Sequence, residues 1–251
     1  DAWDVPADAA ISECGKGQFE VNLLHCADAV KAADDAALFK FIVRGVARKH
    51  GMGATFMAKP YGEDAGSGFH LHASMLDQSG DNIFDDGSEW GGSKLRSAVS
   101  GMLDHMADST LLFAPHLNSF RRLRDGTHAP TMAAWGNDNR TAAVRIPASP
   151  GRARRFEHRV AGADANPYLV LAAVLAAALE GIKAGAEPPA AFTGSSYDQD
   201  LPRLPASWND SLFRFERSGF IERTFGDTFR QAFVAAKKQE IDTFAEAVSA
   251  V

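Results

Sequence analysis

The chain is poor in cysteine, in long apolar runs and in positive charge. Cys14 and Cys26 are the two cysteines among 251 residues, which excludes a disulfide framework and agrees with a cytoplasmic location. The longest uninterrupted apolar run, residues 168–179, is too short to cross a bilayer, so no membrane association is expected. Lys and Arg number 26 against 32 Asp and Glu, a net charge of −6, so nucleic acid is not an expected partner.

The positive charge that is present is concentrated in residues 121–159. This segment holds nine arginines, no lysine and three acidic residues, so it carries +6 while the rest of the chain carries −12. A planar guanidinium binds carboxylate and phosphate groups through paired hydrogen bonds. The segment therefore predicts a site for multi-oxygen anions. The remaining composition, 45% hydrophobic and 23% charged, is that of a globular protein with one large domain or two small ones.

The hydrophobic pattern predicts strands and helices in an order that favours an α+β fold over a parallel βαβ sheet. Residues 1–10 are predicted to be a loose lead-in, and residues 186–207 to be irregular because they contain four prolines. The predicted strands are residues 17–24, 55–58, 69–76, 131–135, 141–146 and 155–160, and the predicted helices are residues 28–50, 93–113, 167–183 and 208–248.

Two carboxylates flank a glycine-rich turn near the beginning of the chain. Glu13 and Glu20 stand on either side of Gly15-Lys16-Gly17. Carboxylates separated by a tight turn can converge on one hard divalent cation. The same spacing also fits two solvated acids beside a turn, since charged side chains are mostly exposed.

A second group of polar side chains follows the glycine-rich loop 62–68. Residues 69–76 alternate strictly, so His70, His72 and Ser74 share one face of a strand while apolar residues share the other. That face could carry a metal ligand and phosphate contacts. The alternative is an ordinary solvent-facing side of a strand.

The arginine-rich segment contains a third group. Arg155, Glu157 and Arg159 alternate on one face of a predicted strand, Arg140 and Arg145 flank another, and Arg122 lies upstream. This pattern fits a metal-bound carboxylate with arginines that hold phosphate, and equally a ladder of salt bridges. Neither a G-x-S-x-G nor a C-x-x-C motif is present, which disfavours serine, cysteine and zinc chemistry.

Several long segments resemble the glutamine synthetase superfamily. They are GQFEVNLLH, ATFMAKPYGEDAGSGFHLHASM, NSFRRLRDGTHAP, NRTAAVRIP and RRFEHRVAGADANPYLVLAA, in the family's order and at matching distances. The tracts FMAKPY and RVAGADANPYLV are most similar to the γ-glutamyl-polyamine (γ-glutamylputrescine) synthetase branch. The resemblance implies a catalytic domain with a curved antiparallel sheet flanked by helices, in a protein that forms ring or double-ring homo-oligomers.

The resemblance also implies roles for individual residues. Glu13 and Glu20 resemble ligands of one divalent ion, and His70 and Glu157 resemble ligands of a second, Mg²⁺ or Mn²⁺. Gly66, Arg122 and Arg159 resemble contacts to the substrate glutamate, and Arg140 and Arg159 resemble the catalytic arginines. The implied ATP contacts are His72, Ser74, Arg140, Arg145 and Arg155.

The chain departs from the family pattern at three places. The E-x-E metal strand and the small β-grasp domain that the family places upstream are not found in residues 1–251, so the chain is expected to be a catalytic domain truncated at its N-terminus and inactive alone. His128 stands where ammonia-using members have a glutamate on a mobile flap, which favours another amine. Ala65 replaces an asparagine common in the glycine loop.

The implied activity is an ATP-dependent ligation. The γ-carboxylate of glutamate attacks the γ-phosphate of ATP to give γ-glutamyl phosphate, and an amine, expected to be a polyamine or another organic amine, then displaces phosphate. The alternatives are a glutamine synthetase that uses ammonia, a non-catalytic structural or regulatory member of the fold, and a phosphagen-type guanidine kinase, against which the branch likeness argues.

Overall fold

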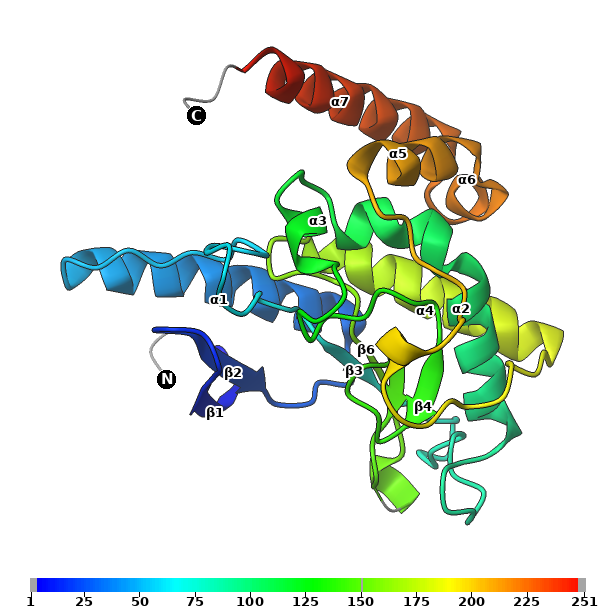
Figure 1. The fold of residues 1–251 in the computed structure, drawn as a ribbon. Helices are drawn as coiled ribbons and strands as arrows, with labels where there is room; N and C mark the ends of the chain where they lie inside the picture. The colour runs from blue at the N-terminus through cyan, green and yellow to red at the C-terminus, as the bar shows by residue number, and fades with distance from the viewer. Residues whose placement is uncertain (1–3, 150, 248–251) are drawn as a thin grey trace.

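The computed structural model describes residues 4–149 and 151–247 and has the predicted α+β class (Figure 1). The strands are β1 (Ala7–Ser12), β2 (Phe19–Leu23), β3 (Leu71–Ala73), β4 (Trp135–Asn137), β5 (Val144–Ile146) and β6 (Phe156–His158). The helices are α1 (Ala29–Lys49), α2 (Ser93–Phe113), α3 (Ser119–Arg122), α4 (Pro167–Ala184), α5 (Trp208–Arg217), α6 (Gly219–Phe225) and α7 (Asp227–Glu246), with 3₁₀ turns η1 (Gly151–Ala153) and η2 (Ser196–Asp198).

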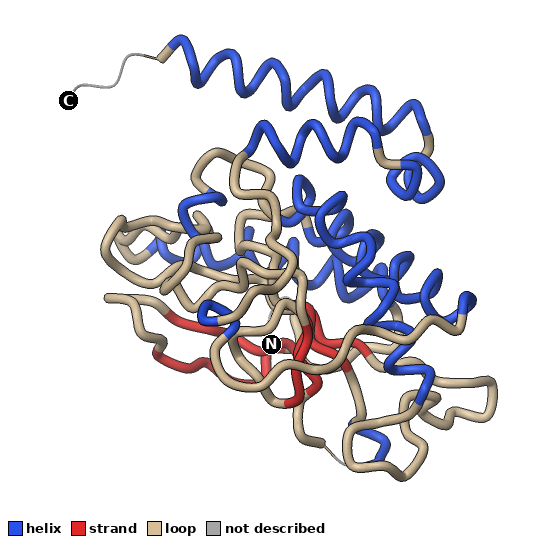
Figure 2. The backbone as a smooth tube through the Cα atoms, turned by 45° about the vertical axis from the view of Figure 1, so that its right-hand side comes forward, coloured by secondary structure: helices blue, strands red, loops and turns tan. Residues whose placement is uncertain are grey.

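A four-stranded sheet in the order β3-β6-β5-β4 lies at the centre of the molecule, and helices cover one of its sides (Figure 2). β6 pairs antiparallel with β3 and with β5, as expected. β4 departs from that expectation, because it pairs parallel with β5. The loop 138–143, which begins at Asp138 with a φ of 46° in the left-handed region, returns the chain to the level of Trp135, so Val144 pairs with Trp135 and the two strands run in the same direction.

β1 and β2 form a separate antiparallel hairpin. The predicted strand at residues 17–24 is confirmed as β2, but β1 begins at Ala7, so the prediction of a loose lead-in is wrong for residues 7–10; residues 1–3 lie outside the described part. All six β1 residues are exposed, and their sequence, ADAAIS, has no alternating apolar pattern. The β conformation of these residues therefore comes from pairing with β2 and not from their own sequence pattern.

Two other strand predictions are wrong because the backbone in those segments forms hydrogen bonds with other partners. Residues 55–58 form no strand, since the Thr55 hydroxyl accepts a hydrogen bond from the Met57 amide at 3.1 Å in a local turn. The segment predicted as a strand at residues 131–135 contributes only Trp135 to β4. Its first residues pair with the chain near Pro202 instead, through an isolated bridge between Met132 and Arg203.

The predicted helices are confirmed in position. α2 spans residues 93–113 as predicted, and α1 and α4 differ from the prediction by one or two residues at their ends. Asp28 and Asn166 cap α1 and α4 with side-chain oxygens that accept backbone amides of the first turn. The helical C-terminal region is divided into α5, α6 and α7 by Ser218 and Gly226, and Val248 lies outside the described residues.

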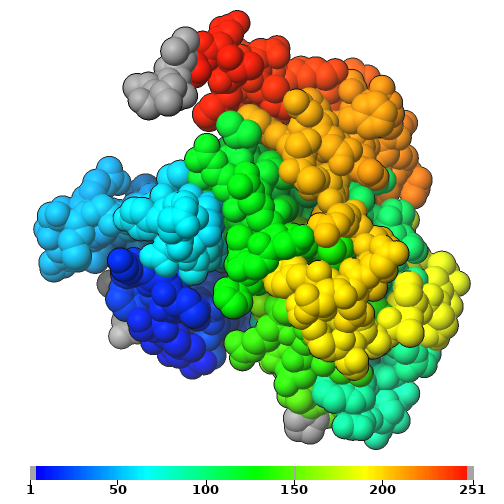
Figure 3. Space-filling model, viewed as in Figure 1, coloured from blue at the N-terminus to red at the C-terminus, as the bar shows by residue number. Residues whose placement is uncertain are grey.

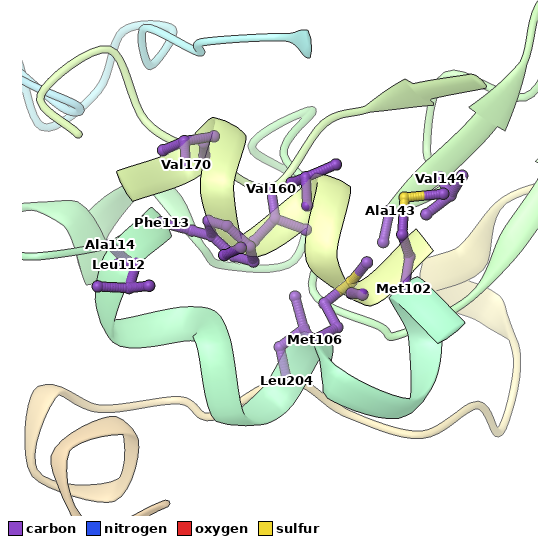
Figure 4. Packing of buried hydrophobic residues seen from close by; sticks show 14 of the residues in the cluster. Met102, Met106, Leu112, Phe113, Ala114, Ala143, Val144, Val160, Val170 and Leu204 are labelled. Carbon is purple, nitrogen blue, oxygen red and sulfur yellow. The ribbon is translucent and has the colours of Figure 1, made fainter. Parts of the chain in front are cut away.

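α2 and α4 cross at backbone contact distance beneath the sheet. A Cβ added to Gly101 would lie 2.1 Å from the carbonyl oxygen of Ala177, and one added to Gly181 would lie 2.0 Å from that of Ser97. Only glycine fits at either position. The apolar core lies between these helices and the sheet, where Met102 and other side chains meet (Figure 4).

α4 is long and apolar enough to cross a membrane by length and composition alone, although 44% of it is buried inside the protein. It contacts α2 and α1, and its buried residues belong to the hydrophobic core. Asn166 caps its first turn, and Gly185, with a φ of 61°, ends it in the left-handed conformation. These features are typical of a core helix.

Candidate functional site

One face of the sheet carries the charged side chains that the sequence singles out. The register places His72 opposite Glu157 across β3 and β6, and Arg145 opposite Glu157 across β5 and β6. Adjacent residues point to opposite faces of a strand, so Phe156 and His158 face the core. The predicted alternation of residues 69–76 is thereby confirmed for β3.

Glu157 is the centre of this face. Its side chain is 3% exposed and is held by two arginines, with Arg145 Nη1 at 2.8 Å from Oε2 and Arg159 Nη1 bonded to Oε1. His70 Nδ1 lies 3.3 Å and His72 Nε2 lies 3.8 Å from Oε1. One buried carboxylate thus gathers two cations and two imidazoles, and the alternating Arg-Glu-Arg pattern of β6 is partly a ladder of ion pairs.

Both imidazoles are held neutral by their surroundings. Burial lowers the pKa of His70 well below its ordinary value, and the charges of Arg159 and Arg122 lower it further. Burial also lowers the pKa of His72, an effect that Glu157 opposes. Arg155 Nε donates to His72 Nδ1 at 3.1 Å, so the ring proton of neutral His72 lies on Nε2, which faces Glu157.

The hairpin brings a further carboxylate toward this face. Glu20, in β2, is half-buried, and burial raises its pKa. The neighbouring carboxylates of Glu13 and Glu157 raise it further, whereas Arg140 and Arg159 lower it. Glu20 therefore lies in the shared field of the predicted metal ligands and of the predicted catalytic arginines.

The predicted metal ligands come together as pairs. His70 lies against Glu157 on the same face, and Glu13 is close enough to Glu20 to shift its pKa. Within residues 4–149 and 151–247, however, no three carboxylate, imidazole or thiol side chains are close enough to share one metal ion. Glu157 also raises the pKa of Glu20, so the two pairs lie near each other, and metal binding by these four residues stays a prediction.

Arg122 and the glycine loop lie directly behind His70. A Cβ on Gly66 would come within 2.9 Å of Arg122 Cγ, and a Cβ on Gly68 within 2.8 Å of His70 Nε2. Arg122 is buried and donates to the carbonyl oxygens of Val160 at 2.7 Å and Arg159 at 3.2 Å. Burial lowers its pKa to about 10, so it stays charged at neutral pH. Through these two hydrogen bonds Arg122 holds the backbone of residues 159 and 160 in place.

The remaining predicted residues surround the same face. Arg140 is exposed in the loop between β4 and β5, Ser74 directly follows β3, and Arg155 directly precedes β6. Sequence reasoning missed two side chains, Asp138 and Gln18. Asp138 binds Arg145 from the side opposite Glu157. Gln18 lies in the turn between Glu13 and Glu20, called the acidic turn below, and joins it to the glycine-rich loop 62–68, called the glycine loop. The position of Gln18 in the turn between two candidate metal ligands was the one signal in the sequence that could have indicated it.

The fold and this charged sheet face define the class to which the protein belongs. Residues 1–251 match the sequence model described as "Glutamine synthetase, catalytic domain", and the chain belongs to this family. A solved structure of GmaS in complex with ADP superposes with a TM-score of 0.90 at 33% identity, covering 99% of this chain and 59% of that one.

Individual relatives share up to about two fifths of the sequence. The chain is 42% identical to gamma-glutamylputrescine synthetase PuuA of Escherichia coli, over 96% of its own length and 51% of that protein. It is 37% identical to glutamate–isopropylamine ligase of Pseudomonas sp., over 93% and 52%, and 36% identical to gamma-glutamylethanolamide synthetase GlnA4 of Streptomyces coelicolor, over 96% and 52%. The chain spans about half the length of these relatives.

Proposed function

We propose that the protein is an ATP-dependent ligase that joins the γ-carboxylate of glutamate to an organic amine through γ-glutamyl phosphate. The observation that carries the proposal is the sheet face on which Glu157 gathers His70, Arg145 and Arg159. Such a face combines hard ligands for a cation with fixed positive charge for phosphate. Relatives named for γ-glutamylputrescine, γ-glutamylethanolamide and glutamate–isopropylamine synthesis support an organic amine as the second substrate.

The donor set fits divalent metal ions. Glu13 with Glu20 would hold one Mg²⁺ or Mn²⁺, and His70 with Glu157 would hold a second. Carboxylate oxygens suit such ions, and the lowered pKa of His70 keeps its ring neutral, so one ring nitrogen has a lone pair free to bind. Burial and the carboxylates of Glu13 and Glu157 raise the pKa of Glu20, and a bound cation would offset the repulsion among these carboxylates. When bound, the ions neutralise charge on the phosphates of ATP.

The arginines supply stabilisation that is in place before the reaction. During phosphoryl transfer, negative charge spreads over three oxygens of the moving group. Arg159, held by Glu157 and by the Arg122 contact to its backbone, presents its guanidinium without reorganisation. Arg140 lies near the same group, since its charge, like that of Arg159, lowers the pKa of Glu20. Arg159 and Arg140 thus stabilise the transferred group as the carboxylate oxygen bonds to phosphorus and ADP leaves.

Substrate binding falls to the loops around these groups. In the proposal, the backbone at Gly66 holds the amino acid and Arg122 supports it from behind. His72, Ser74, Arg145 and Arg155 contact ATP. The Arg155–His72 hydrogen bond fixes both side chains in one orientation toward the nucleotide. In the second step the amine nitrogen attacks the acyl carbon, the bond from that carbon to the phosphate oxygen breaks, and the nitrogen gives up its proton to the departing phosphate.

The amine would enter at the loop that carries His128. This side chain is exposed, and its φ of 62° places it in the left-handed region. Tyr197 and Thr127 hold the loop, with the Tyr197 hydroxyl donating to Ala129 O at 2.7 Å and that of Thr127 to Arg122 O at 2.5 Å. An imidazole supplies no permanent negative charge for an ammonium ion, which supports an amine with further contacts.

The proposal includes assembly into a homo-oligomer. Large apolar side chains are exposed along the N-terminal half, among them Phe19 at 69%, Val30 at 66% and Phe41 at 65%. Exposed apolar surface on this scale is typical of a protein interface.

The test is phosphate release by the whole protein with glutamate, Mg²⁺-ATP and each of putrescine, ethanolamine, isopropylamine and ammonia. We expect release that depends on both glutamate and an organic amine. Arg159→Lys keeps the charge but loses the planar fork, and should lower kcat/KM by about 100-fold or more with little change in folding. Activity of this variant within twofold of wild type contradicts the role of Arg159.

A non-catalytic, structural role is the second candidate, and the engagement of both Glu157 oxygens by arginines favours it. In that case the ion pairs would serve the fold alone. Titration calorimetry with Mg²⁺-ATP separates the two, because a structural ladder requires no nucleotide binding.

A further inference from the structure

The acidic turn and the glycine loop are fastened together by side chains of known orientation. The Lys16 amide donates to Asp64 Oδ2 at 2.9 Å, and Gln18 Nε2 donates to Gly66 O at 2.9 Å and to Ser67 Oγ at 3.2 Å. In Figure 3 the dark-blue hairpin lies directly against the cyan segment that leads into this loop. These hydrogen bonds therefore join the element that carries the predicted ligands to the element that carries the predicted substrate contact.

Gln18 has a fixed orientation in this contact. Its Oε1 accepts the Gly15 amide at 3.0 Å, and because an amide nitrogen cannot accept, Nε2 must face the glycine loop. The backbone of the same residue closes the turn, since the Glu13 amide donates to Gln18 O at 3.0 Å. A side chain between two proposed metal ligands thus reaches the backbone of a separate loop.

The Gly66 carbonyl is the group that this contact orients. A carbonyl oxygen has two lone pairs, and Gln18 takes one of them. Arg122 and the Ala58 carbonyl lie against the Gly66 Cα, where an added Cβ would come within 2.9 Å and 2.8 Å of them, so this peptide is closely packed. The second lone pair remains for a ligand, and a carbonyl oxygen suits the three donors of an ammonium group.

We propose that Gln18 is a positioning residue that aims the Gly66 carbonyl at the α-ammonium group of bound glutamate. This inference rests on the proposed function. It assigns to Gln18 a part of the selection for an amino acid over a simple dicarboxylate, because both share the γ-carboxylate and the amino acid alone carries the ammonium group.

The test compares Gln18→Met with Gln199→Met in the whole protein, assayed with glutamate, Mg²⁺-ATP and the preferred amine. Gln199 is a matched control, since it is also half-buried and also braces a loop, donating to Thr193 O at 2.6 Å. Glutarate, which is glutamate without its amino group, serves as a competitive inhibitor. For Gln18→Met we expect the KM for glutamate to rise about fivefold, as one hydrogen bond requires, with the KM for ATP and the inhibition constant of glutarate unchanged. For Gln199→Met we expect no change in any of the three.

Each contrary outcome identifies what fails. An active wild type with an unaltered Gln18→Met overturns the inference alone, and so does a variant in which glutamate, glutarate and ATP all weaken together. A wild type without glutamate-dependent phosphate release overturns the proposed function and this inference with it. Gln18→Glu replaces Gln18→Met if the latter fails to fold, because it keeps the acceptor for Gly15 and removes the donor to Gly66; it also adds a negative charge, so an unchanged KM for ATP is required of it as well.

Discussion

The ion pairs around Glu157 allow a stability prediction with a built-in control. Glu157→Gln keeps the size of the side chain but removes its charge. Arg159, 10% exposed, has Glu157 as its only carboxylate partner in the described part of the chain, whereas Arg145 also binds Asp138. The substitution therefore leaves one buried guanidinium without a counterion.

The expected loss follows from burial. Removing one partner of a buried pair costs about 3–5 kcal/mol, and the remaining amide oxygen places this case near about 3 kcal/mol. Asp138→Asn removes the other acid that binds Arg145, but Asp138 is 50% exposed, so its loss should cost at most about 0.5 kcal/mol.

The measurement is urea unfolding of both variants and the wild type at pH 7 with EDTA, so that no divalent ion contributes. We expect a lower midpoint for Glu157→Gln at an unchanged slope, and near-wild-type unfolding for Asp138→Asn. Equal losses in the two variants, or a loss below about 1 kcal/mol for Glu157→Gln, would refute the argument from burial.

Two further predictions concern the helices and the core face of the sheet. Gly181→Ala should destabilise the folded protein by about 2 kcal/mol or more, because its new Cβ would meet a backbone carbonyl. Gly45→Ala, where α1 has open space, should stabilise the fold by up to about 1 kcal/mol, since alanine favours a helix more than glycine does. Thermal melts of the two variants and the wild type measure both changes. Burial lowers the pKa of His158 to about 3, so the folded state stays neutral while the unfolded chain takes a proton below about pH 6.5. Stability from this residue is therefore complete above that pH and is lost at about 1.4 kcal/mol per unit as pH falls, and His158→Leu should flatten this slope between pH 6.5 and 5 in urea unfolding.

The sequence predicts best what depends on local periodicity. An apolar stripe predicted the helix at residues 28–50, Pro115 marked the end of the helix at 93–113, and strict alternation placed His70 and His72 on one face. Strand pairing is a different matter, because partners come from distant segments. β1 has no pattern of its own, and the start of the segment predicted at 131–135 is taken by residues near 203.

The candidate site could be predicted as a set of residues but not as a set of contacts. Spacing and resemblance together identified Glu157 and its arginines. Which arginine nitrogen meets which carboxylate oxygen depends on register across three strands, and no spacing within one segment encodes that. The side chain of Gln18 reaches a loop 48 residues away, a distance at which local pattern carries no information.

The glycine crossing of α2 and α4 has a consequence for how the sequence can change over evolution. Replacing both glycines together gives no relief, because each new methyl group would meet backbone atoms and not the other side chain. The crossing is thus set by backbone shape, so substitutions elsewhere in the two helices can redistribute core volume without altering how the helices meet. His158, next to Glu157 in β6, lies against Phe113 of α2 and lines a small cavity with side chains of α2 and α4. Homologous sequences can therefore differ in their core residues while the charged face of the sheet keeps its geometry.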